Sequence, residues 1–234
     1  MVFPLYDDNT DRSRTPFVNY ALIAINIFVF VVLQGLGSNE QFTYSLSTVP
    51  YEITTGTDVI TPTPVPVYLT LITSMFMHGS LIHLGGNMLF LWIFGDNVED
   101  RLGHIRYLGF YLITGLIASL AHVFTTAAFA SDERTMMIPS LGASGAISGV
   151  LGGYLLLHHS RRVTVILFRF LTQVPAYVAI GLWFLFQLIS GLGVLGEGAE
   201  QGGIAYAAHI GGFIAGLVLV KLFDMGHATR APAY

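Results

Sequence analysis

The segment Leu141-Gly-Ala-Ser-Gly-Ala-Ile147 places a serine between small residues at the start of a long apolar stretch. Two more polar motifs interrupt other apolar stretches, His83-Leu-Gly-Gly-Asn87 early in the chain and Ala208-His209-Ile-Gly-Gly212 in the last one. Polar side chains are costly in hydrocarbon, and those that occur there tend to be functional. The three motifs are therefore the first candidates for a site.

Composition indicates a protein that lies in a membrane. Charged residues make up 10% of the 234 residues and the mean hydropathy is +0.67, whereas soluble domains carry about 25% charged residues. A membrane-spanning helix needs roughly 20 mostly apolar residues. The sequence predicts an all-α polytopic membrane protein with six spans, at about Phe17–Leu36, Leu81–Gly95, Ile105–Ala128, Ser144–His159, Phe170–Leu192 and Ile204–Phe223.

Three parts of the chain follow from these spans. Residues 1–16 are polar and are expected to form a short cytoplasmic tail, disordered or interfacial. Residues 17–223 would form the membrane domain and residues 224–234 a short cytoplasmic C-terminal tail. The loop 37–80 would lie on the outer side, and Gly95–Gly103 would form a compact polar turn on the inner side.

The distribution of Lys and Arg predicts the orientation, because short cytoplasmic loops carry an excess of both. With six spans all but one of the basic residues fall on one side: Arg12, Arg14, Arg101, Arg106, Arg161, Arg162, Arg169, Lys221 and Arg230. Only Arg134 falls on the other. Both termini are therefore expected in the cytoplasm, with the membrane being the plasma membrane of a prokaryote.

Several functional classes are disfavoured. The chain has no cysteine, which rules out disulfides, thiolate metal sites and a cysteine nucleophile. No basic patch suggests nucleic acid. His78 and His83 are five residues apart and so do not share a helix face as the paired ligands of a zinc helix do. We expect no metal site.

The three motifs are expected at similar depths in the membrane. Ser144 opens the fourth span at its outer end, and His209 lies about 8 Å into the sixth span, at 1.5 Å per residue. His83 and Asn87 lie at a similar depth in the second span, which runs in the same direction. The motifs therefore share one outer layer of the bilayer.

These residue types match the chemistry of acyl transfer. A serine needs an adjacent base to become a nucleophile, and histidine is the usual base because its pKa is near neutral. The oxyanion that forms needs fixed donors. The amide of Ser144 at a helix start, the side chain of Asn87 and the ring of His83 can supply them. The sequence thus predicts a serine protease site, with Ser144 as nucleophile and His209 as general base.

Each residue also has a purely structural alternative. A serine in a membrane helix often bonds back to a backbone carbonyl, and an intramembrane histidine can serve as a structural hydrogen-bonding group. Glycines at i, i+4 spacing let two helices approach closely. We expect close packing of the fourth and sixth spans, with structural support of the site from Gly142, Gly145, Gly149 and Gly212.

The chain resembles the rhomboid intramembrane serine proteases. The matching pieces are His78-Gly-Ser-Leu-Ile-His83-Leu-Gly-Gly-Asn87, Gly95-Asp-Asn-Val-Glu99-Asp-Arg101-Leu-Gly103, Gly142-Ala-Ser144-Gly145 and Ala208-His209-Ile-Gly-Gly212. The resemblance implies a six-helix fold that cleaves transmembrane protein substrates near their outer ends and needs neither a metal nor a cofactor. It implies that His83 and Asn87 lie near the oxyanion, that His78 is structural, and that Glu99 with Arg101 stabilises the first loops.

Two features depart from that family. Some members carry an aromatic residue four positions after the serine, stacked on the catalytic histidine, where this chain has Ser148. Some carry a Trp-Arg pair in the first loop, and loop 37–80 contains neither residue. We also expect a Ser–His dyad without an acid, because the nearest acids lie in loops. Packing of the sixth span on the fourth, and neutral groups such as Ser148, would then orient His209.

Two other functions compete with an active protease. An inactive rhomboid-like protein that binds membrane clients would typically lack the serine or the histidine, and both are present. A small transporter or channel would favour acids within the spans or paired broken helices. No acid falls inside a predicted span and no internal repeat is visible.

Overall fold

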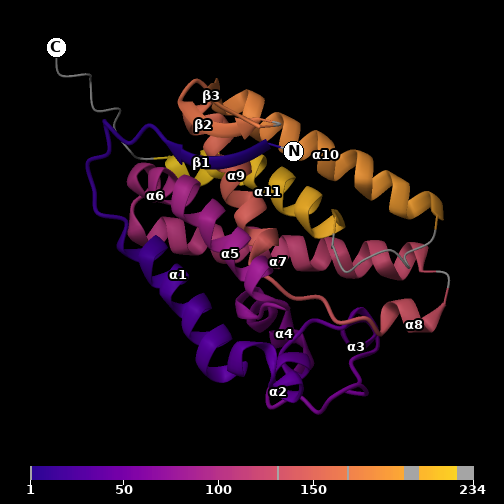
Figure 1. Cartoon of the computed structure of the whole chain (residues 1–234). Coiled ribbons are helices and arrows are strands. Elements are labelled where there is room, and N and C mark those ends of the chain that lie inside the picture. The colour runs from indigo at the N-terminus through magenta and orange to yellow at the C-terminus, as the bar shows by residue number, and fades with distance from the viewer. Residues whose placement is uncertain (1, 131, 168, 198–205, 226–234) are drawn as a thin grey trace.

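The computed structural model describes residues 2–130, 132–167, 169–197 and 206–225 (Figure 1). Most of this part of the chain is helical, and a small antiparallel sheet lies at one end of the helices. The longer helices are α1 (Phe17–Phe28), α5 (Leu81–Phe90), α7 (His104–Phe129), α9 (Ser144–His158), α10 (Ala176–Glu197) and α11 (Tyr206–Asp224). The shorter ones are α2 (Glu40–Ser45), α3 (Pro50–Thr55), α4 (Thr70–Thr73), α6 (Asp96–Leu102) and α8 (Glu133–Met136).

Within the part of the chain that the structure describes, two helices, α7 and α11, are long and apolar enough to cross a membrane by length and composition. A third span is possible if the segments Val67–Phe76 and Leu81–Leu102, which meet at 79°, count as one. The apolar helices Phe17–Leu33, Ser144–His158 and Ala176–Leu192 are shorter. They occupy the other predicted spans, so the six-span arrangement remains a prediction. The first two residues of the predicted sixth span, at 204 and 205, lie outside the described residues.

The prediction of an all-α protein is wrong at the end of the molecule where the three-stranded sheet lies. Strand β1 (Val2–Asp7) pairs antiparallel with β2 (Arg162–Leu167), which pairs antiparallel with β3 (Phe170–Pro175). Residues 2–7 of the predicted tail are thus a strand and not disordered or interfacial, and the fifth long helix begins at Ala176. Strand β2 contains four consecutive β-branched residues, 163–166, which favour a strand, and three of them, Val163, Thr164 and Val165, are buried.

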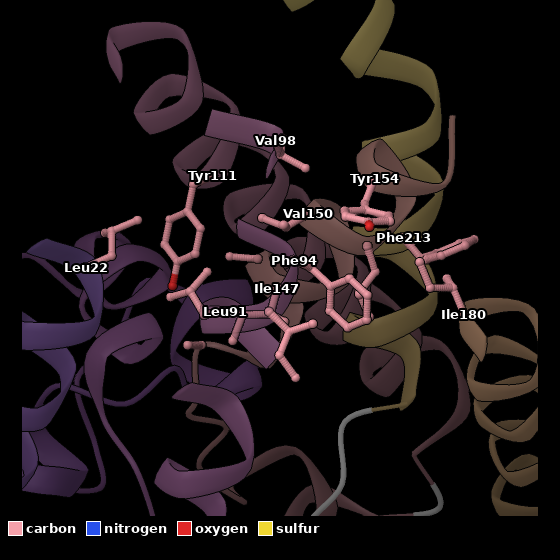
Figure 2. Packing of buried hydrophobic residues seen from close by; sticks show 14 of the residues in the cluster. Leu22, Leu91, Phe94, Val98, Tyr111, Ile147, Val150, Tyr154, Ile180 and Phe213 are labelled. Carbon is pink, nitrogen blue, oxygen red and sulfur yellow. The ribbon is translucent and has the colours of Figure 1, made fainter. Parts of the chain in front are cut away.

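Helix α9 lies at the centre of the helical core (Figure 1). Its small residues let its neighbours approach. A Cβ added to Gly149 would overlap the Thr114 side chain of α7, and one added to Gly216 of α11 would overlap the carbonyl oxygen of Gly149. Larger apolar side chains form the core cluster to which α9 contributes, and Figure 2 shows several of them: Leu22, Leu91, Phe94, Val98, Tyr111, Ile147, Val150, Tyr154, Ile180 and Phe213.

The segment after α5 is helical and not a polar turn. A π-helical stretch, Leu91–Gly95, joins α5 to α6. In α6 the buried Glu99 accepts hydrogen bonds from the backbone N–H groups of Val18 and Asn19 at 2.9 and 2.6 Å, and so caps the start of α1. Free N–H groups at a helix start favour a carboxylate there.

Arg101 also acts at this end of the molecule. Its guanidinium forms two hydrogen bonds with Asp224, at 2.7 and 2.8 Å, and so ties α6 to the end of α11. Figure 1 shows α6 at the end opposite α2 and α3. The expected stabilisation of the first loops by Glu99 and Arg101 is therefore replaced by contacts with α1 and α11.

A buried polar cluster attaches β1 to the helices. Asp7 accepts hydrogen bonds from the Tyr154 hydroxyl at 2.6 Å and from the Asn97 amide at 2.7 Å. Nearby, Asp96 is paired with Arg12 at 2.6 Å. Burial is the largest cause that raises the pKa of the Asp7 carboxyl, to about 7. The first strand is thus held by a group that titrates near neutral pH.

Candidate active site

Ser144 and His209 meet between α9 and α11. The hydroxyl oxygen of Ser144, the first residue of α9, lies 2.7 Å from Nε2 of His209. The two helices can come this close because Gly212 has no side chain. A Cβ there would overlap the carbonyl oxygen of Gly145. Both partners of the pair are half-buried. The predicted neighbours are therefore within hydrogen-bonding distance, as a nucleophile and its base must be.

The other ring nitrogen of His209 contacts a residue that the sequence analysis missed. Nδ1 lies 2.8 Å from Oε1 of Gln187, which comes from α10 and is 7% exposed. The ring of Trp183, one turn earlier on α10, lies 6.1 Å from the His209 ring between centroids. A polar residue within the apolar stretch Leu182–Ile189 was the available signal.

Ser148 does not take the place of the missing aromatic residue. Its hydroxyl donates to the backbone carbonyl of Ser144 at 2.6 Å, one turn earlier in α9. That is the ordinary back-bonding of a serine in a helix. The expectation that Ser148 orients His209 is therefore wrong. The neutral group that contacts Nδ1 of His209 is Gln187.

A second group of side chains lies beside the serine loop. A Cβ added to Gly142 would meet the ring of His83 at 2.8 Å and the side-chain nitrogen of Asn87 at 3.7 Å. These distances place both residues of α5 against the loop that leads to Ser144. Gly142 has φ +125°, a conformation that side chains with a Cβ rarely adopt. The backbone N–H of Gly142 donates to the carbonyl of Ser74 at 2.9 Å, and this bond holds the loop in place.

His78 connects this group to Gln34, which follows the apolar helix Phe17–Leu33. Its Nε2 lies 2.9 Å from the side-chain nitrogen of Asn87, and its ring is fully buried. Gln34 bonds both backbone groups of His78, donating to the carbonyl at 2.9 Å and accepting from the N–H at 3.0 Å. His78 thus orients Asn87, and the contacts of Gln34 were not predicted from the sequence.

These side chains form one half-buried site from α5, α9, α10 and α11. The first N–H groups of a helix have no partner within it, so the amide of Ser144 is available to an anion. Asn87 has a second amide hydrogen besides the one directed at His78. Among the residues that the structure describes, no three His, Asp or Glu side chains form a group that could hold a metal ion. The geometry suits a serine nucleophile with nearby donors.

Comparison with known proteins gives a consistent family. The Rhomboid domain model matches residues 66–224. The chain is 30% identical over 200 residues to "Rhomboid protein 1, mitochondrial" of Saccharomyces cerevisiae, covering 85% of this chain and 51% of that protein. It is 29% identical over 208 residues to "Rhomboid protease GluP" of Bacillus subtilis, covering 88% of this chain and 34% of that protein.

A plant protein gives a similar match. "Rhomboid-like protein 11, chloroplastic" of Arabidopsis thaliana is 29% identical over 169 residues, which cover 68% of this chain and 54% of the relative. The chain thus spans about half or less of the length of these three relatives. One name says mitochondrial, another says chloroplastic, and the third relative is from a bacterium, so they do not assign this chain to one cellular membrane.

Proposed function

Because the chain belongs to the rhomboid family of integral membrane proteins, we propose that it is an intramembrane serine endopeptidase. Its substrates would be transmembrane helices of other membrane proteins, cut near their outer ends. The observation that carries this proposal is the 2.7 Å contact between Ser144 and Nε2 of His209, beside donors from α5. The relative named "Rhomboid protease GluP" supports the same activity.

The first half of the proposed reaction forms an acyl-enzyme. His209 takes the proton of Ser144 through Nε2, and the serine oxygen attacks the carbonyl carbon of the scissile peptide bond. Negative charge develops on the carbonyl oxygen. The Ser144 amide, the free amide hydrogen of Asn87 and the ring N–H of His83 stabilise it. The protonated His209 then gives its proton to the leaving amine, and the C–N bond breaks.

The second half releases the other product. Water enters the site and gives a proton to His209 as its oxygen attacks the acyl carbon. The tetrahedral intermediate collapses, the bond to the Ser144 oxygen breaks, and the proton returns to Ser144. The half-buried pair leaves access for this water. No step requires a metal or a cofactor, because each proton moves between groups already described.

The arrangement in the membrane belongs to the same proposal. Six apolar helical segments would cross the bilayer within residues 17–223. They include the long α7, with 26 residues, and the short α9, with 15. The sheet end would face the cytoplasm. Ser144, at the opposite end of α9 from its junction with β2, would then lie toward the outer face.

A cleavage assay tests the proposed function. The purified protein in liposomes should cut a model transmembrane substrate, and Ser144→Ala and His209→Ala should each abolish cleavage while the protein stays folded. Loss of either member of such a unit costs about as much as loss of both. Undiminished cleavage by Ser144→Ala would contradict the proposal, and a folded wild-type protein without activity would favour a client-binding role.

A further inference from the structure

The environment of Nδ1 of His209 points to a role for Gln187. The amide oxygen of Gln187 lies 2.8 Å from Nδ1, and the residue is 7% exposed in an otherwise apolar part of α10. A primary amide buried without hydrogen bonds costs several kcal/mol in an apolar medium. Burying the Gln187 amide here is therefore costly unless the amide forms its hydrogen bond with His209.

We infer that Gln187 is a positioning residue, a neutral third member beside Ser144 and His209. This inference rests on the proposed protease function. An amide oxygen can only accept a hydrogen bond, so its contact requires the proton of the neutral imidazole to be on Nδ1. The lone pair of Nε2 then faces the Ser144 hydroxyl. That is the tautomer in which His209 can accept the serine proton.

A neutral group suits this position better than an acid. In soluble triad enzymes a carboxylate holds the base histidine and stabilises the imidazolium. A carboxylate in a membrane interior is expensive unless it is paired. Gln187 supplies the acceptor without placing a charge there while His209 is neutral. The amide dipole still stabilises the imidazolium that forms when Ser144 gives up its proton, although less than a full charge would.

Helix α10 holds the imidazole by a second contact as well. Trp183 and Gln187 are four residues apart, so they share one face of the helix. The Trp183 ring lies at 6.1 Å and 37° to the ring of His209, within the range of favourable aromatic pairs. The base on α11 is thus oriented from α10, whereas the nucleophile comes from α9.

The test compares two changes at one position with a matched control. Gln187→Leu removes the acceptor, and Gln187→Glu keeps it. Gln173→Leu makes the same change in β3, where the side-chain amide of Gln173 lies 3.4 Å from the Thr164 hydroxyl. Without this acceptor the imidazole is held less well in the productive orientation, so Gln187→Leu should lower kcat by roughly 10- to 100-fold with KM nearly unchanged. Gln187→Glu should recover most of that loss, and Gln173→Leu should leave turnover unchanged.

A tautomer measurement provides a readout that a merely structural role would not affect. In nitrogen-15 spectra of histidine-labelled protein, the signals lost in His209→Ala identify His209. They should report a proton on Nδ1 in the wild type and a mixture of tautomers in Gln187→Leu. If Gln187→Leu does not fold, Gln187→Met replaces it. A wild-type proton mainly on Nε2, unchanged kcat in Gln187→Leu, or equal losses in the Leu and Glu variants would overturn the inference.

These outcomes separate the two proposals. A wild-type protein that is folded but inactive would count against the protease function, and the tautomer spectrum would still test the contact with Gln187. An active wild type with a Gln187→Leu variant of equal kcat would overturn only the positioning role.

Discussion

Asn87 has two amide hydrogens, and one is directed at Nε2 of His78 at 2.9 Å. The other can face the developing oxyanion. Removing one such donor costs on the order of 10²–10³ in rate, so Asn87→Ala should lower kcat by about that factor and leave residual cleavage through the Ser144 amide. Asn26→Ala is the matched control, because Asn26 is also buried but donates to the Leu22 carbonyl in α1. Equal kcat in wild type and Asn87→Ala would remove Asn87 from the oxyanion site.

For single residues, the sequence predicts which side chains belong to the site better than it predicts which of them contact one another. The pairing of Ser144 with His209 could be predicted, because two motifs in different spans agreed in depth. The contact of Gln187 could not, since one glutamine in an apolar stretch does not reveal which helix it faces. Ser148 was assigned by its position in the family pattern, and its hydroxyl instead satisfies the local backbone.

At the scale of helices, the approach of α11 to α9 brings the base to the nucleophile. A Cβ at Gly216 would overlap the carbonyl oxygen of Gly149, so Gly216→Ala should push the helices apart. Overpacking of this kind costs about 1–3 kcal/mol. We expect a lower melting temperature and a lower kcat.

Gly181→Ala is the control for this prediction. Gly181 lies within α10, and a Cβ there meets no atom within 4 Å. Alanine is favoured over glycine in a helix by roughly 0.5–1 kcal/mol, so this variant should be as stable as the wild type or slightly more so. A Gly216→Ala protein with wild-type melting temperature and kcat would contradict the role assigned to the contact.

Strand β1 should be attached in a pH-dependent way. Burial raises the pKa of Asp7 from 3.8 to about 7, while Asp96 raises it and Tyr154 and Arg161 lower it. Between about pH 4 and pH 7 the folded protein keeps a proton that the unfolded chain has lost. Stability therefore falls as pH rises through this window, and the loss is complete above about pH 7.

Asp7→Asn tests this dependence. The asparagine oxygen can still accept from Tyr154 and Asn97, but it carries no charge at any pH. Melting temperatures in detergent at pH 5 and pH 8 should differ less for the variant than for the wild type, and at pH 8 the variant should be the more stable. The other charged and titratable groups nearby, Asp96 with Arg12 and also Arg161 and His158, are common to both proteins. Equal pH dependence in the two proteins would show that Asp7 does not control it.

The three-stranded sheet could not be predicted from hydropathy. Apolar helices could be located because uncharged blocks of sufficient length are a strong signal. Phe170–Pro175 was placed in the fifth helix, since short apolar runs of strand and helix look alike without their partners. The pairing of β1 with β2 joins residues about 160 positions apart, and no local pattern in Val2–Asp7 reveals it.

At the scale of the whole molecule, basic residues gather at the sheet end. Arg12 pairs with Asp96, Arg101 with Asp224 and Arg161 with Asp11, and Figure 1 shows β1, β2 and α6 at this end. Arg134 belongs to α8, near α3 at the other end. Because cytoplasmic segments are enriched in Lys and Arg, the sheet end should face the cytoplasm.

Cysteine labelling tests this orientation without background, since the chain has no cysteine. Val59 lies in the loop after α3 and Phe170 begins β3, and their side chains are 51% and 77% exposed. In intact cells or right-side-out vesicles, Val59→Cys should react with an impermeant maleimide and Phe170→Cys should react only after permeabilisation. The reverse pattern would place Ser144 near the cytoplasmic face.

The central claim is that Ser144 is an activated nucleophile, and a labelled fluorophosphonate tests it most directly. Such a probe phosphonylates a serine only when a base activates it. Incubation of the folded protein in liposomes, followed by digestion and mass spectrometry, should locate one probe on the peptide that contains Ser144. Ser144→Ala and His209→Ala should lose the label. An unlabelled wild-type protein, or labelling that persists in Ser144→Ala, would contradict the account.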